Sequence, residues 1–376
     1  MPRNLAPLAA AAFAAALSPS GLAIEAPAAE AIHPIPVATA TTWSGPQAVQ
    51  AGRDGRAYVL DLGTYEVYPY RRTEAVLGPP EPFETIPSDR DGGPPVLGVS
   101  MSLDGEWMTF NPPNRVRYFE RDREAHLPLP TWEVTSVGWW DDRPAVGVLP
   151  HQLGGPLDGA GDASDVWDPP PVLLAYDSRR SQWEPIHSRP LEQPSPEAQR
   201  PWRSTVLASG PKGSTWLIWD YRYQVLRLDR TRKIRDRFTV GTGEPEYKAR
   251  TDAHQRRMEE EIAKRGGAPR DLPTQIAAKR IRAAAGHGDR LYLLTTAGEG
   301  PRPFTLDRYA PDVGEGATLE RVALALPTYR GRLTLAAAKD GLMLTHYRGT
   351  QGRHLIPWAV LDVASWEPVE GAQFED

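Results

Sequence analysis

The sequence predicts an all-β protein built as a β-propeller of six blades, and three observations support this prediction. Units with period-2 patterning and hairpin turns recur along most of the 376 residues. Each unit combines a tight turn with up to four short strands, which is typical of one propeller blade. The chain also contains 39 prolines, 33 glycines and 12 tryptophans, which suits many short strands and turns better than helices.

The N-terminus is typical of a secretory signal. Arg3 precedes an Ala-rich apolar stretch at residues 5–17, and Gly21-Leu22-Ala23 has the small-x-small pattern of a cleavage site. Residues 1–23 are therefore predicted to be a signal peptide cleaved near Ala23, and the protein is expected to be secreted or periplasmic. A retained N-terminal anchor is the alternative. No later stretch is long and apolar enough to span a bilayer.

Residues 24–44 are predicted to be a flexible leader that ends in a strand. The Ala/Pro/Glu-rich part suits a flexible segment. The β-branched residues of Val37–Thr42 favour a strand, which we expect to pair with the last blade and close the ring. The chain contains no cysteine, so a secreted form has to be held together by burial of its core instead of disulfides.

The clearest unit is Gly210–Arg230. A tight turn at Lys212-Gly213 leads into a strand that alternates through Trp216, Ile218 and Asp220, and a second strand follows at residues 225–228. Alternation with a turn between the two runs predicts a hairpin.

The same pattern occurs six times between residues 45 and 371, with a C-terminal tail at 372–376. The turn markers are Asp54-Gly55, Asp104-Gly105, Asp141-Asp142, Lys212-Gly213, Gly288-Asp289 and Asp340-Gly341. A strand of small or apolar residues precedes each marker, at 48–50, 97–101, 135–138, 205–208, 281–284 and 333–336. Weaker fourth strands are predicted in most units, for instance at 182–184, 237–240, 320–323 and 366–369. Units three and five depart from the pattern, so the blade count is six with an uncertainty of one; a β-sandwich is the alternative fold.

These units resemble the repeats of secreted bacterial six-bladed propellers of the NHL-like type. Gly55, Tyr58, Val59 and Asp61 match the first half of that repeat. The second half is matched by Asn114, Arg115, Val116 and Phe119, and the opening unit by Gly213, Trp216, Ile218, Asp220 and Val225. The resemblance covers residues 45–371 and implies an architecture, not an activity, because this fold has many unrelated functions.

Two insertions interrupt the repeat. Residues 152–171 form a loop rich in Gly, Asp and Pro, and residues 244–279 contain a predicted helix. That helix begins at the capping box Asp252-x-x-Gln255 and ends at Gly266-Gly267. Alternation of strand direction places the long connections at one end of the ring, where we expect a ligand to bind. The alternative is that exposed turns simply tolerate insertions.

The connections at this end also have a basic bias in a chain whose formal net charge is -5. The predicted ligand-binding residues are Arg203, Asp220, Tyr221, Arg222, Lys279, Arg280, Arg330, Arg332, His346 and Arg348. Such a mouth suits an anionic small molecule, a glycan, or a peptide or protein. The alternative is that the arginines pair with Asp61, Glu66 and Asp220 to join blades. The acidic balance argues against a nucleic acid partner, and we expect a monomer.

No catalytic motif is found, so catalytic residues are unknown and neither a metal nor a cofactor is predicted. The eight histidines are scattered without zinc-binding spacing, and the inner strands lack the carboxylates of a calcium cage. Nothing supports a quinone cofactor, and Asp61 and Asp220 are expected to cap their own turns. The prediction is a binding or scaffold propeller. The alternative is an extracellular hydrolase or lyase that acts on an anionic sugar or lactone.

The tryptophans divide into two groups. Those in predicted strands, expected in the core, are Trp107, Trp139, Trp216 and Trp219. Those in predicted turns or insertions are Trp140, Trp167 and Trp202, which either stack on a sugar or peptide or fill gaps between blades.

Overall fold

The computed structural model describes the strands and many of the turns. The described residues are 35–39, 46–50, 57–61, 66–70, 76–77, 84–85, 98–102, 106–111, 115–120, 123–127, 132–152, 171–188, 205–220, 223–241, 256, 260, 263–264, 281–296, 304–311, 317–324, 332–338, 341–347, 358–361 and 366–375.

Within these residues the strands form six sheets, numbered here in chain order. Sheet 1 contains β2 (Pro46–Gln50), β3 (Ala57–Asp61), β4 (Glu66–Tyr70) and β6 (Glu84–Thr85). Sheet 2 contains β7 (Gly98–Met101), β8 (Trp107–Asn111), β9 (Arg115–Glu120) and β10 (Arg123–Leu127). Sheet 3 contains β11 (Trp132–Trp140), β12 (Arg143–Gln152), β13 (Pro171–Asp177) and β14 (Gln182–Ser188).

The other three sheets each have a contribution from a chain end. Sheet 4 contains β15 (Thr205–Ser209), β16 (Thr215–Trp219), β17 (Gln224–Leu228), β18 (Ile234–Val240) and β27 (Ala372–Glu375). Sheet 5 contains β19 (Ile281–His287), β20 (Arg290–Thr296), β21 (Phe304–Ala310), β22 (Thr318–Leu324) and β26 (Glu367–Pro368). Sheet 6 contains β23 (Arg332–Ala338), β24 (Gly341–Tyr347), β25 (Trp358–Leu361), β1 (Ile35–Thr39) and β5 (Val76–Leu77).

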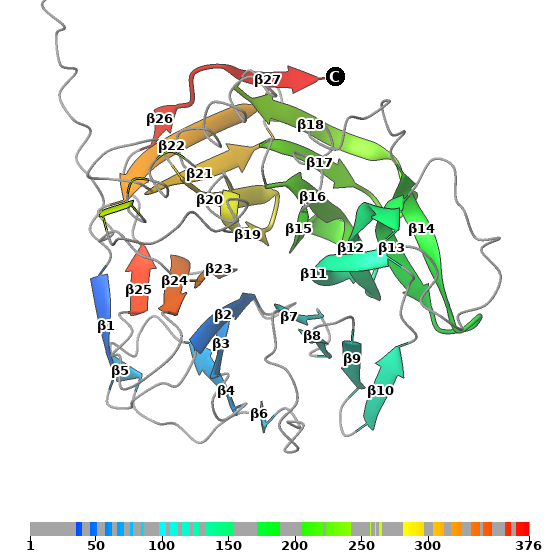
Figure 1. Cartoon of the computed structure of the whole chain (residues 1–376). Coiled ribbons are helices and arrows are strands. Elements are labelled where there is room, and N and C mark those ends of the chain that lie inside the picture. The colour runs from blue at the N-terminus through cyan, green and yellow to red at the C-terminus, as the bar shows by residue number, and fades with distance from the viewer. Residues whose placement is uncertain are drawn as a thin grey trace, which may run out of the picture.

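The sheets are arranged radially around a common centre (Figure 1). The first strand of each unit is innermost, and these strands contact one another in the cyclic order β2, β7, β11, β15, β19, β23 and back to β2. Each following strand lies further out. This is the arrangement of a β-propeller, so the predicted all-β class and propeller arrangement are confirmed.

The inner strands require small residues because they crowd at the axis. Gly286 of β19 shows this most clearly, since a Cβ atom there would lie 1.9 Å from the carbonyl oxygen of Ser209 on β15. Any larger residue would therefore displace the backbone of one inner strand or the other.

Alternation along each strand divides its side chains between two inter-sheet cores. On β16, Trp216 and Ile218 pack toward sheet 5, whereas Leu217 and Trp219 pack toward sheet 3. All four are buried. One sheet thus supplies apolar surface to both neighbours, which is why a blade needs a ring of others to cover it.

The N-terminal strand lies in the last sheet. β1 pairs antiparallel with β25, with Val37 opposite Trp358, and it pairs in parallel with β5. The strand begins at Ile35, two residues before the predicted one. That this pairing holds the ring closed stays a prediction.

The C-terminus differs from the sequence prediction. The segment 366–369 was expected to be the fourth strand of its own unit, but β26 pairs with β22 of sheet 5. The predicted tail 372–376 contains β27, which pairs with β18 of sheet 4. The position that this segment would have taken in sheet 6 is occupied by β1.

Within the predicted helical insertion the structure describes four residues. These are Arg256, Glu260, Ala263 and Lys264, which are helical and exposed. The extent of the insertion stays a prediction, and its other residues lie outside the described set. In the part of the chain that is described, no helix has the length and apolar character needed to cross a membrane.

Candidate functional site

The register of the hairpins defines one end of the ring, which we call the mouth end. β15 begins at Thr205 opposite Trp219, and β19 begins at Ile281 opposite Thr295. The connection that enters each inner strand therefore lies at the same end as the turn that follows the second strand. A ligand is expected at this end from the sequence.

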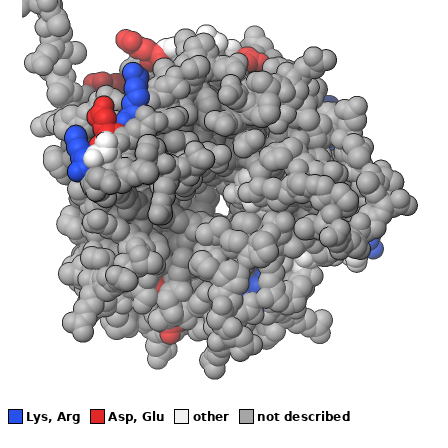
Figure 2. Space-filling view, viewed as in Figure 1, with Lys and Arg blue, Asp and Glu red and all other residues white. Residues whose placement is uncertain are grey.

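The structure describes only part of the predicted site. Seven of the ten predicted site residues lie outside the described residues, namely Arg203, Tyr221, Arg222, Lys279, Arg280, Arg330 and Arg348. Arg332 and His346 lie at the mouth end of neighbouring strands in sheet 6, where Leu333 is opposite His346. Most of the face around the centre of the ring belongs to residues that are not described (Figure 2).

Asp220 is the one predicted site residue whose side chain is described. It is fully buried at the end of β16. Its carbonyl oxygen accepts a hydrogen bond of 2.9 Å from the backbone N–H of Ile281. The end of the second strand of sheet 4 is thereby joined to the start of the inner strand of sheet 5. Burial of the carboxylate favours a structural role, and a part in ligand binding stays a prediction.

Sequence reasoning missed the residue that ends the same turn, Tyr223. Its φ of 51° is in the left-handed region, and its backbone N–H donates to the carbonyl of Trp219 at 3.0 Å. The side chain is fully buried, and its hydroxyl donates to the carboxylate of Asp307 on the next sheet. A turn residue of sheet 4 is therefore fixed against the third strand of sheet 5.

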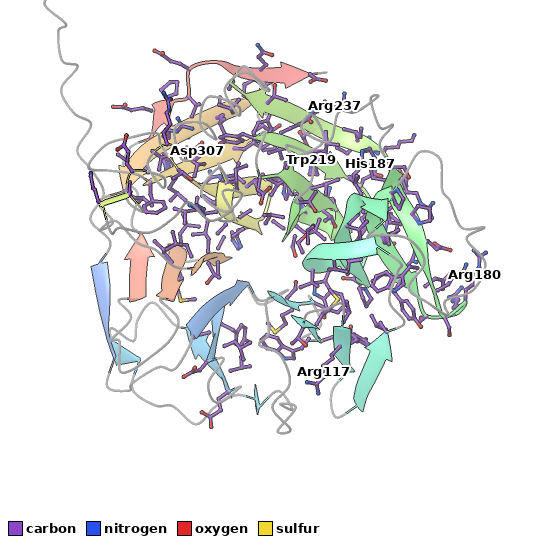
Figure 3. The ribbon with its side chains drawn as sticks, viewed as in Figure 1. Arg117, Arg180, His187, Trp219, Arg237 and Asp307 are labelled. Atoms are coloured by element: carbon purple, nitrogen blue, oxygen red, sulfur yellow. The ribbon has the colours of Figure 1, made fainter. Side chains whose placement is uncertain are left out.

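Asp307 is a fully buried carboxylate between these two sheets (Figure 3). It accepts a bidentate pair from Arg321, with Nε–Oδ1 at 2.6 Å and Nη2–Oδ2 at 2.7 Å. Burial by itself lowers the pKa of Arg321, but the hydrogen bonds and negative charge of Asp307 outweigh it and raise that pKa above its ordinary value. Because three donors already occupy Asp307, we infer that it joins the sheets and does not act as a base.

A second polar group lies further out between the same sheets. Asp236 of β18 accepts from Arg227 and, at 2.9 Å, from the hydroxyl of Tyr309. Burial raises the pKa of Tyr309, and the negative charge of Asp236 raises it further. The ring of Tyr309 stacks on Phe238, with centroids 4.5 Å apart. This group too is a tie between blades, here through the hydrogen bond from Tyr309 of sheet 5 to Asp236 of sheet 4.

The tryptophans predicted for the core are there, and Trp140, for which ligand stacking and gap filling were both open, fills a gap between two sheets. Trp140 is 3% exposed at the end of β11. Its indole N–H donates to the carbonyl of Asp229 at 3.1 Å, so it joins sheets 3 and 4 and is not available for stacking on a ligand. Trp167 and Trp202 lie outside the described residues.

Metal ligands do not gather in the part of the chain that can be seen. No group of three or more His, Asp or Glu side chains that could hold a metal ion occurs among the described residues.

No protein-family model matches the chain, and no curated protein matches its sequence. Three similar solved structures are a streptogramin B lyase (12% identity, TM-score 0.44, covering 87% of this chain and 97% of that one), the virginiamycin B lyase of Staphylococcus aureus with quinupristin (13%, 0.41, 91% and 94%) and the PQQ-bound aldose sugar dehydrogenase of Streptomyces coelicolor (14%, 0.43, 87% and 97%). At these identities and TM-scores the likeness says nothing about activity.

Proposed function

We propose that the protein is an exported binding or scaffold propeller of six blades, each of the six sheets being one blade, and that it takes an anionic ligand at the basic mouth end. The ligand is an anionic small molecule, a glycan with carboxylate or sulfate groups, or a peptide or protein segment. Neither a metal nor a cofactor is part of the proposal. The hydrolase or lyase alternative stays a prediction from sequence, since no described residue favours it.

One observation carries the proposal, the hydrogen bond of 2.9 Å between the Asp220 carbonyl and the Ile281 N–H. Arg280 precedes Ile281 by one residue, and Arg222 follows Asp220 by two. Along the chain, each arginine is therefore within two residues of the bond. The bond supports a common location for cations of two blades that are far apart in sequence.

The chemistry of these residue types supports an oxoanion as the ligand. A guanidinium presents a planar fork of donors that matches carboxylate, sulfate and phosphate groups. Arginines on several rigid strands can hold such a group with little loss of freedom on binding. Arg332 and His346, at the mouth end of sheet 6, extend the same surface to a third blade.

A thermal-shift experiment tests this function. A ligand that binds only the folded state raises the melting temperature in proportion to the logarithm of its concentration. We expect such a shift with oligogalacturonate or an acidic peptide, and its loss in the variant Arg280→Ala, Arg332→Ala. The matched control is Lys212→Ala, Arg290→Ala, which removes the same charge from exposed turn positions on sheets 4 and 5 at the opposite end of the ring. An equal shift in all three proteins would exclude the basic mouth as the site.

Export has a separate test. Mass spectrometry of the protein recovered from its host should find an N-terminus close to residue 24. A chain that keeps residues 1–23 would instead support the retained anchor.

A further inference from the structure

The end of the ring opposite the mouth carries a second charged surface, on the turns of sheets 3 and 4. The β13–β14 turn (residues 178–181) and the β17–β18 turn (229–233) both follow a third strand, so both lie at this end. Glu184 of β14 connects them, since it accepts from Arg180 of the first turn at 3.0 Å and from Arg232 of the second at 3.4 Å. Arg232 also donates to the carbonyl of Pro185 on β14 at 3.2 Å. The two turns therefore form one continuous surface.

Exposed cations dominate this surface, which we call the basic rim. Its members are Arg179, Arg180, Arg230, Arg232, Lys233 and Arg235, all exposed. The carboxylates beside them are Asp177, Glu184 and Asp229, all partly buried. Asp141 and Asp142 lie nearer the axis, on the turn after an inner strand. Among the described residues 177–184 and 229–235 there are thus six cations and three carboxylates, in a chain that is acidic as a whole.

The three carboxylates are already engaged. Glu184 accepts from Arg180 at 3.0 Å, Arg143 at 3.3 Å and Arg232 at 3.4 Å. Asp229 accepts from Thr231 and Arg235, and the hydrogen bond from the Thr231 hydroxyl is the main cause that holds its pKa well below the ordinary range. Asp177 accepts from the backbone N–H of Arg179 at 2.9 Å. These three engaged carboxylates still leave an excess of positive charge among the described residues of the two turns.

Three cations of the basic rim are not engaged by these carboxylates. Among the described residues, the side chains of Arg179, Arg230 and Lys233 have no carboxylate partner. Arg180, next to Arg179 in sequence, lies at the outer edge of the ring (Figure 3). Like charges repel, and none of the three exposed side chains contributes to the core. Their arrangement therefore has no structural role that would offset the repulsion.

An apolar side chain lies within the same surface. Ile234 is 39% exposed, and it stands between Lys233 and Arg235. Only Phe374 is a comparably exposed large hydrophobic residue in the part of the chain that is described. A soluble polyanion gains nothing from this isoleucine, whereas the interface of a lipid bilayer accepts an apolar side chain beside phosphate groups.

We propose that the basic rim docks on a membrane surface that contains anionic phospholipids. The two turns lie at the same end of the ring, so their cations can meet a flat surface together. The guanidinium of Arg232 lies over the ring of Trp140, with Cζ 6.0 Å from the centroid, which restricts its orientation before contact. Phosphate groups accept from guanidinium in pairs, and Ile234 enters the interface between them. In this orientation the mouth end faces away from the membrane.

Vesicle sedimentation of the purified chain tests the proposal. We expect binding to vesicles of phosphatidylglycerol and phosphatidylcholine in equal parts, weaker binding to phosphatidylcholine alone, and a loss of the difference as salt is raised. In Arg230→Glu, Lys233→Glu the partition onto the anionic vesicles should fall by about tenfold or more. Both side chains are exposed and outside the core, so an unchanged melting temperature will show that the variant is folded.

A control variant separates the basic rim from net charge. Arg256→Glu, Lys264→Glu makes the same change at exposed positions of the insertion, and it should bind as the unmodified chain does. All variants carry the same N-terminal segment, so its contribution is common to them. Equal binding of the rim variant and the control variant to anionic vesicles would overturn the proposal.

The substitution Ile234→Ser distinguishes a membrane from a soluble polyanion. We expect it to weaken vesicle binding several-fold and to leave retention on immobilised heparin unchanged. If vesicle binding is also unchanged and heparin is bound as tightly as the vesicles, the surface takes a soluble polyanion and the membrane proposal is wrong. The experiment does not depend on the mouth-end ligand.

Discussion

At the scale of single residues, charged groups between blades are tolerated only where their partners are complete. Asp307 is fully buried, and its cost of desolvation is offset by Arg321 and Tyr223. One position along, Arg308 and Glu320 form a cross-strand pair on the opposite face of the same two strands, where both are partly exposed. The two neighbouring pairs compare a fully buried carboxylate with a partly exposed one.

We expect Asp307→Asn to destabilise the protein by about 2–3 kcal/mol, because it removes the counter-charge of Arg321, whose side chain is 31% exposed and so stays partly hydrated. Tyr223→Phe should cost about 1.5–3 kcal/mol, the range for a hydrogen bond to a charged group. Glu320→Gln, the matched control, should cost less than about 1 kcal/mol. Urea-induced unfolding measures all three. Similar losses for Asp307→Asn and Glu320→Gln would contradict the role given to the buried pair.

Tyr309 makes the free energy of unfolding depend on pH in the alkaline range. Its ordinary pKa is 10.0, and burial together with the charge of Asp236 raises that pKa in the folded protein. The unfolded chain therefore releases this proton at a lower pH than the folded one does. The stability that Tyr309 contributes is complete below about pH 10 and is lost as the pH rises from there through the folded pKa.

Tyr309→Phe should accordingly flatten the alkaline limb of the stability profile. At neutral pH the variant loses its hydrogen bond to Asp236, which is worth about 1 kcal/mol or somewhat more. Above about pH 10 the difference from the unmodified protein should shrink. Urea midpoints measured across this range check the prediction. A difference that stays constant with pH would show that Tyr309 does not titrate as described.

At the scale of elements, the C-terminal segment connects two blades at the circumference. It runs along the outer edges of sheets 5 and 4, as Figure 1 shows. Val369 is 9% exposed and its N–H donates to Leu319 at 2.8 Å. Trp366 lies under the guanidinium of Arg308, and Phe374 lies opposite Phe238. Neighbouring blades diverge toward the circumference, and this segment bridges two of them there.

Removal of residues 366–376 should therefore lower the melting temperature. Burial of Val369 alone is worth about 1.5–3 kcal/mol, which corresponds to a shift of about 2–4 °C for a domain of this size. Removal of residues 372–376 deletes β27 and keeps Val369, so it should have a smaller effect. Differential scanning fluorimetry compares the two truncations. An unchanged melting temperature after the longer truncation would show that the segment does not hold the blades together.

At the scale of the whole molecule, the propeller separates two surfaces by the length of its strands. Each strand reverses direction, so the turns after first and third strands face one way and the remaining connections face the other. The predicted anionic ligand belongs to one end and the basic rim to the other. Substitutions at one end are therefore not expected to disturb binding at the other, and the two proposals fail or hold independently.

Much of the fold could be predicted because its signals are local. The alternation that puts Trp216 toward one neighbour and Leu217 toward the other is visible in five consecutive residues. The candidate site was harder to predict, because its contacts join residues that are far apart in the sequence. Tyr223 and Asp307 are 84 residues apart, and Trp140 and Asp229 are 89 apart. An aspartate within the apolar strand 304–310 was the only sign of the buried tie.

By itself the sequence determined where strands and turns form and that they repeat, because period-2 burial and turn chemistry act over a few residues. Only the tertiary structure decided that β1 completes the last sheet, that β26 and β27 cover the edges of sheets 5 and 4, and that Asp307 and Trp140 are buried ties. Edge pairing and burial depend on which segments meet in space. Short strands of similar composition leave that choice open until the ring assembles.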